Sequence, residues 1–156
     1  LPPPAQALTA ARERAEHGGS FGEYFAWAGA ALYAKQPSEA LTASSKALEA
    51  WPSHPLSRHS FDMLHNLHQM RTRAYLDLGD LPRAEASLLA SLDNQNLAWI
   101  IPFPELIAAR RLLAMNQRSI VLAYLEKAVP HFPANRDRLQ GWIEELKLGK
   151  TPALRE

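Results

Sequence analysis

Apolar residues recur three and four positions apart through most of the 156-residue sequence, which is the spacing of one face of an α-helix. The clearest case is the stretch 21–34, where Phe21, Phe25 and Leu32 belong to the pattern and no strand-like alternation competes with it. The same reasoning predicts helices over 5–17, 21–34, 39–50, 57–78, 81–92, 105–115, 119–129 and 136–148. The pattern therefore predicts an all-α fold.

Residues that favour helix ends separate these stretches. Gly18-Gly19 ends the first helix, and Pro37 suits the first turn of the third. Gly79 can adopt the left-handed conformation that ends a helix, while Asp80 can cap the next one. The residues 93–96 are expected to form a polar loop, and the proline-broken stretch 99–104 an extended, partly buried connection.

The predicted helices pair into hairpins that repeat along the chain. Superposing the second helices of these hairpins aligns Ala40, Ala84 and Val121, which are 44 and 37 residues apart. A second position, seven residues later in each helix, is held by Ala47, Ser91 and Ala128. Small residues at such positions allow two helices to approach closely, so the pattern indicates an irregular internal repeat.

Two stretches resemble the tetratricopeptide repeat (TPR) family. The first is the inter-helix turn Tyr-Leu-Asp-Leu-Gly-Asp-Leu-Pro-Arg-Ala-Glu at 75–85, and the second is 39–52, with small residues seven apart and a closing proline. The resemblance covers 21–148, with departures at Gln36-Pro37, at Asn96 and at Val121, and other helical repeats remain an alternative. The repeat intervals also exceed the roughly 34 residues usual in this family.

The resemblance implies a right-handed α-α superhelix of about three helical hairpins, with an N-terminal helix and a C-terminal capping helix. It divides the chain into a proline-rich lead with the first helix at 1–20, a TPR-like domain at 21–148 and a tail at 149–156. Asn135 is expected to cap the last helix. That helix has one apolar and one charged face, as the end of a helical stack requires.

In this family the first helix of each hairpin lines a concave groove that binds a peptide or protein partner. The positions implied here are Phe25, Leu32, Asn66, Gln69, Arg73, Leu106 and Arg110. An arginine binds a carboxylate through two parallel hydrogen bonds, so Arg73 and Arg110 beside Asn66 are candidates to hold an acidic side chain or a chain terminus. The alternative is that both arginines only solvate a helix face or pair with acidic neighbours.

Composition narrows the function classes without naming a partner. The net charge of +1 gives no strong field for nucleic acid, and no apolar run approaches the length of a membrane helix. The absence of cysteine excludes disulfides and thiolate zinc sites, and is compatible with the cytoplasm and with a bacterial periplasm or cell envelope. Leu1-Pro2-Pro3-Pro4 is expected to be a spacer arriving from an upstream segment.

A histidine cluster raises the question of a metal site, because His54, His59, His65 and His68 lie within fifteen residues. On a helix, however, Asp62 and His68 point about 120° apart, so these histidines are expected to be solvated or packed rather than metal-binding. No nucleophile elbow, phosphate loop or paired-carboxylate motif is present. We therefore expect no enzymatic activity, no cofactor and no metal.

The resulting hypothesis is a non-catalytic scaffold that binds a protein or peptide in its groove, with no nucleic-acid partner and no membrane insertion. The alternative is an accessory TPR-like domain of a bacterial envelope machine, such as a glycan polymerase, a transferase or a secretion system. The sequence leaves the partner and the oligomeric state open.

Overall fold

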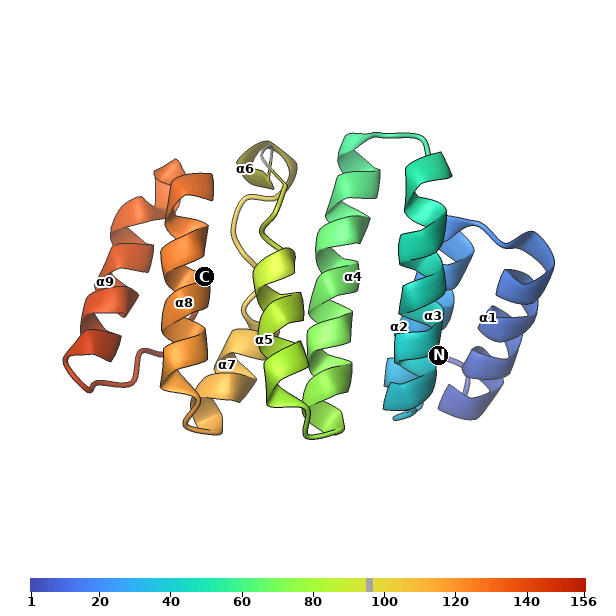
Figure 1. Ribbon diagram of the computed structural model, residues 1–156, viewed down its shortest axis with the longest axis horizontal. Helices are drawn as coiled ribbons and strands as arrows, with labels where there is room; N and C mark the ends of the chain where they lie inside the picture. Colours follow the sequence, from blue (N-terminus) through green and yellow to red (C-terminus); the bar gives the residue numbers. More distant parts are fainter. Residues whose placement is uncertain (95–96) are drawn as a thin grey trace.

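The computed structural model describes residues 1–94 and 97–156, and within these ranges the chain is all-helical, as predicted, with no strand. The helices stand side by side in a row from α1 to α9 (Figure 1). Their bounds are α1 Pro4–Gly18, α2 Phe21–Tyr33, α3 Pro37–Ala50, α4 Arg58–Asp77, α5 Leu81–Ala90, α6 Leu97–Ile100, α7 Ile107–Ala114, α8 Arg118–Ala128 and α9 Arg136–Lys147. Short 3-10 turns occupy Trp51–Ser53, Val129–His131 and Pro133–Asn135.

The ends of the predicted helices agree with the structure to within two residues, and two local expectations were wrong. The connection expected to be extended over 99–104 begins with a helical turn, since α6 runs from Leu97 to Ile100. Asn135 precedes α9, but its side chain makes no capping hydrogen bond, and its Nδ2 donates to the carbonyl oxygen of Pro102 at 3.0 Å. Asp93 and Asn94 are non-helical, while Gln95 and Asn96 lie outside the described residues.

One turn geometry ends α2, α4, α7 and α9. In each turn a residue with positive φ donates its N–H to a carbonyl three residues back, and the next N–H reaches a carbonyl five residues back, which is the Schellman motif. The positive-φ residues are Lys35 (56°), Gly79 (75°), Asn116 (60°) and Gly149 (79°). These positions are 44, 37 and 33 residues apart, so the local structure repeats along the chain.

Asp80 begins α5 as the sequence predicts. Its side chain accepts a hydrogen bond from the backbone N–H of Arg83 at 3.2 Å.

The turns after α2, α4, α7 and α9 all lie along one edge of the row, the lower edge in Figure 1.

Small residues bring the helices together. In the cluster that joins α1 to α4, the buried positions are mostly alanines, among them Ala28, Ala31, Ala40 and Ala47. A second cluster, rich in leucine, joins α4 to α9 and includes Leu139, Ile143 and Leu146 on the apolar face of α9. The main packing partners are neighbours in sequence: α2 packs most closely with α3, α4 with α5, α1 with α2, α3 with α4, and α8 with α9. Because α4 also contacts α2, α3 and α7, it links the two clusters.

Candidate functional site

Some of the predicted groove residues are accessible to solvent in the structure, and others are buried or hydrogen-bonded within the chain. Gln69 and Leu106 are only 3% and 1% exposed, so in this conformation they support the interior rather than meet a partner. Asn66 bonds within α4, where its Nδ2 donates to the carbonyl oxygen of Asp62 at 3.1 Å. Arg110 is exposed, but its Nη1 donates to the carbonyl oxygen of Leu154 at 2.9 Å.

The remaining predicted residues keep part of their surface accessible. Phe25 and Leu32 are half-buried against the alanine-rich cluster. Arg73 is half-buried too, and within the described residues it has no hydrogen bond or ion pair. Of the predicted set, the structure therefore brings Leu32 and Arg73 together at one accessible site.

This site, termed here the cationic cleft, is lined by Leu32, Lys35, Pro37, Arg73, Asp77 and Arg111 and has a volume of about 530 Å³. The turn after α2 supplies Lys35, the C-terminal part of α4 supplies Arg73 and Asp77, and α7 supplies Arg111. Leu32 and Pro37 give the cleft an apolar wall. Residues from three separate parts of the sequence thus meet where the helix ends align.

Positive charge dominates the cationic cleft. Arg111 Nη1 lies 2.6 Å from Asp77 Oδ1, which neutralises one arginine. Lys35 and Arg73 have no ion pair among the described residues, so the cleft keeps a formal charge of +2. Positive charge beside a low-dielectric wall concentrates the field and attracts anionic groups.

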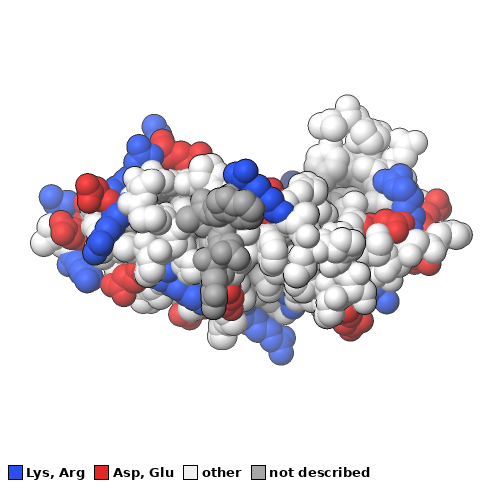
Figure 2. Space-filling model, turned by 90° about the horizontal axis from the view of Figure 1, so that it is seen from above, with Lys and Arg blue, Asp and Glu red and all other residues white. Residues whose placement is uncertain are grey.

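The face of the molecule seen from above carries charges of both signs. On the face seen in Figure 2, Lys and Arg are interspersed with Asp and Glu, so no broad field of one sign covers it.

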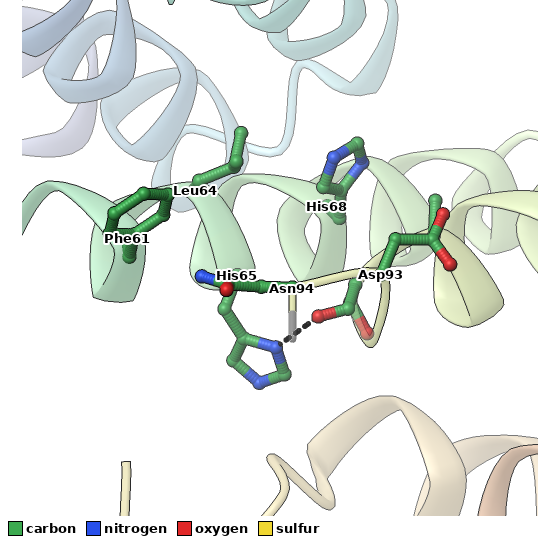
Figure 3. A pocket seen from close by; sticks show the side chains of 8 residues that line it. Phe61, Leu64, His65, His68, Asp93 and Asn94 are labelled. Carbon is green, nitrogen blue, oxygen red and sulfur yellow. Dashed lines mark hydrogen bonds between the residues drawn. The ribbon is translucent and has the colours of Figure 1, made fainter. Parts of the chain in front are cut away.

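A second cavity lies between α4 and the end of α5. Its volume is about 500 Å³, and its lining includes Phe61, Leu64, His65, His68 and Asp93. In Figure 3 the ring of His65 lies below the α4 ribbon and that of His68 above it, although both line this cavity. No group of three metal-ligating side chains is found within 1–94 and 97–156.

A hydrogen-bonded network fills the interior beside this second cavity. His65 Nδ1 lies 2.7 Å from the carbonyl oxygen of Ser91, and because a carbonyl only accepts, Nδ1 carries the proton. Gln69 Nε2 donates to Ser91 Oγ at 2.9 Å and to Tyr124 Oη at 3.1 Å. Tyr124 Oη in turn donates to the carbonyl oxygen of Glu105 at 2.8 Å. The network connects α4, α8 and the segment before α7.

Burial shifts the pKa values of His65, His68 and Tyr124. It lowers the pKa of His65, and it lowers the pKa of His68 to about 4, with the charge of Arg71 as a smaller cause. Burial also raises the pKa of Tyr124. Both histidines are therefore neutral at pH 7.

Sequence reasoning missed Lys35, Asp77 and Arg111. Lys35 stands in a turn rather than on a periodic helix face, and the next positive charge of the cleft is 38 residues away. Arg111 directly follows Arg110, so it points to a different side of α7. One signal was available: a lysine occupies the turn position that glycine holds after α4 and α9.

Comparison of the chain with protein-family models, curated proteins and solved structures returned no match. None of the described helices has both the length and the apolar character needed to cross a bilayer.

Proposed function

We propose that this chain is a non-catalytic helical scaffold of the TPR type that binds an extended acidic segment of a protein partner in the cationic cleft. The same Schellman turn after α2, α4, α7 and α9 supports the repeat part of this proposal. Its intervals of 44, 37 and 33 residues converge on the roughly 34 residues of a TPR unit. In such an array the turns stack, so side chains at equivalent places line one continuous surface.

The observation that carries the binding role is the excess of cations in the cleft. Lys35 and Arg73 lack protein partners among the described residues, although holding two like charges at one site is unfavourable without a counter-charge. A carboxylate of a partner would supply that charge and can accept two hydrogen bonds from a guanidinium. The apolar wall of Leu32 and Pro37 suits a small aliphatic side chain next to it in an extended peptide.

Binding of short labelled peptides tests this proposal. By fluorescence anisotropy, a peptide of alternating glutamate and serine is expected to bind, and one of alternating lysine and serine is not. The affinity should fall as salt is raised, because the cleft is open to solvent. The variant Lys35→Glu/Arg73→Glu should lose at least about tenfold in affinity, since two attractive charges become repulsive.

A matched control changes the charge equally at a distance. Arg14→Glu/Arg136→Glu alters exposed residues of α1 and α9 and produces the same change in net charge. It should bind the acidic peptide within about twofold of the parent chain at moderate salt. If both variants lose the same affinity for the acidic peptide, binding depends on net charge and not on the cleft. If the folded Lys35→Glu/Arg73→Glu chain loses no affinity, the proposal is wrong.

A further inference from the structure

Large exposed apolar side chains gather at the turns that end α2, α4, α7 and α9. Among the residues that the structure describes, seven large apolar side chains are exposed, and four of them stand in these turns or next to them. They are Tyr33, Leu78, Met115 and Leu148, which are 49%, 47%, 41% and 72% exposed. Single exposed apolar side chains need no explanation, but a concentration at one edge of a fold indicates a contact surface.

The repeated turn places these side chains equivalently. The C-cap residue of each helix, directly before the residue with positive φ, is apolar in all four turns: Ala34, Leu78, Met115 and Leu148. Because all four turns lie along the lower edge of the row in Figure 1, these residues come together along that edge. The turn requires a particular residue only at the position of positive φ, so helix termination does not account for an exposed leucine or methionine before it.

The same turns carry cations that no carboxylate neutralises. Lys35, Arg118 and Lys150 have no ion pair among the described residues. Arg118 Nη2 donates to the carbonyl oxygen of Lys150 at 2.6 Å, which ties the turns after α7 and α9 together without cancelling the charge of Arg118. The one acid in the four turns, Asp80, lies 3.3 Å from Arg83 through its Oδ2. The three cations and this aspartate leave the turns with a formal charge of +2.

We propose that this surface, termed here the turn edge and formed by residues 33–37, 78–81, 115–118 and 148–151, docks on an anionic phospholipid membrane. The negative surface potential of such a membrane attracts lysine and arginine side chains. The leucine, methionine and tyrosine side chains between these cations would enter the boundary between headgroups and acyl chains, where such residues are stable.

The arrangement of the turn edge favours a lipid surface over a folded protein. A protein partner needs a complementary surface with well-packed contacts. None of the four exposed apolar side chains lines the cationic cleft or the second cavity, and each stands at a separate turn. A fluid lipid layer adapts to single side chains, and the row of helices presents its turns side by side to a flat layer (Figure 1). The sequence alone gave no sign of this surface, because its residues meet only when the turns align.

Sedimentation with lipid vesicles tests the proposal. Vesicles of phosphatidylcholine with about one-third phosphatidylserine should bind the chain at low salt, and vesicles of phosphatidylcholine alone should bind it at least about tenfold more weakly. Leu148→Ser should weaken binding to the anionic vesicles at least about threefold, and adding Leu78→Ser should weaken it further, since these side chains would no longer enter the lipid. Lys35→Glu/Lys150→Glu should lose at least about tenfold.

Matched variants make the same changes away from the turn edge. Leu56 is 68% exposed and lies between α3 and α4, at the opposite edge of the row in Figure 1. Leu56→Ser should therefore bind the anionic vesicles as the parent chain does. Arg14→Glu/Arg136→Glu changes the net charge as much as the lysine pair does and should lose less than about twofold at moderate salt. Circular dichroism checks the folding of every variant, and Met115→Ser replaces Leu148→Ser if that chain does not fold.

No sedimentation of the folded parent chain with the anionic vesicles at low salt would overturn the proposal. So would equal losses in Leu148→Ser and Leu56→Ser, or in the two charge variants, because binding would then not depend on the turn edge. If Leu148→Ser changes the oligomeric state of the free chain in analytical ultracentrifugation but not vesicle binding, the edge is an interface between copies and the proposal is wrong.

These outcomes are separate from those of the acidic-peptide experiment. Leu78→Ser/Leu148→Ser should bind the acidic peptide as the parent chain does, because neither leucine lines the cationic cleft. Loss of vesicle binding with unchanged peptide binding in this variant would assign the two contacts to different residues.

Discussion

Lys35 occupies a position where glycine would be more stable, and this gives a quantitative test of the repeated turn. Lys35 has a φ of 56°, in the left-handed region. For a residue with a side chain this conformation is unfavourable by roughly 1–2 kcal/mol. Glycine avoids this penalty but loses roughly 0.5–1 kcal/mol more backbone entropy on folding. Lys35→Gly should therefore raise the free energy of unfolding by about 0.5–1 kcal/mol, or the melting temperature by about 2–3 °C.

Gly79 and Gly149 provide the reverse experiment. A Cβ added at either glycine meets no atom within 4 Å, so Gly79→Ala and Gly149→Ala report the backbone penalty without a steric clash. Each should lower the free energy of unfolding by about 0.5–1 kcal/mol. Asn116→Gly should change it by a smaller amount, because asparagine tolerates the left-handed region.

Urea unfolding followed by far-ultraviolet circular dichroism measures all four variants against the parent chain. Peptide binding gives a second readout for Lys35, because its ammonium group also lines the cationic cleft. Lys35→Gly should stabilise the fold and yet weaken binding of the acidic peptide. If the free energy of unfolding of Lys35→Gly were about 1 kcal/mol lower than that of the parent chain, the left-handed conformation of Lys35 would be refuted.

Two further variants test the half-buried His68 of α4 and the hydrogen-bonded network of Tyr124. Because burial lowers the pKa of His68 from 6.5 to about 4, its neutral form stabilises the fold above pH 6.5, and up to about 3 kcal/mol should be lost as pH falls toward 4. His68→Asn should flatten that part of a plot of unfolding free energy against pH, and an unchanged slope would contradict the buried histidine. Tyr124→Phe leaves the Glu105 carbonyl without its donor and should cost roughly 1–3 kcal/mol in urea unfolding. The matched change at the exposed Tyr33 should cost less than about 0.5 kcal/mol, and equal effects would argue against the network.

The helices could be predicted because their signals are local. Periodic apolar residues mark the buried face of each helix, and Gly79 with Asp80 forms the turn and the cap that their chemistry predicts. One local prediction that failed is the cap at Asn135. Its side chain makes no capping hydrogen bond to α9, and its Nδ2 donates instead to the carbonyl oxygen of Pro102, 33 residues earlier.

The accessibility of the predicted groove residues also depends on distant parts of the chain. Gln69 carries a polar side chain at a position expected to face a partner, but its Nε2 donates to Ser91 and Tyr124 in the interior. Leu106 lies just before α7, which begins two residues later than predicted, and it is buried in the core. Arg110 has the expected accessibility, yet the backbone of Leu154 accepts its hydrogen bond.

The sequence by itself determined the helical class, the positions of the helices and the repeated turns, because these depend on residues within about five positions of one another. Only the tertiary structure decided which lysine and arginine side chains lie together in the cationic cleft. Lys35, Arg73 and Arg111 converge because the ends of α2, α4 and α7 align, and their packing depends on alanines and leucines far apart in the chain. Tertiary packing likewise decided the place of Leu154, which is buried in the cluster that joins α4 to α9 and whose carbonyl oxygen accepts a hydrogen bond from Arg110 of α7.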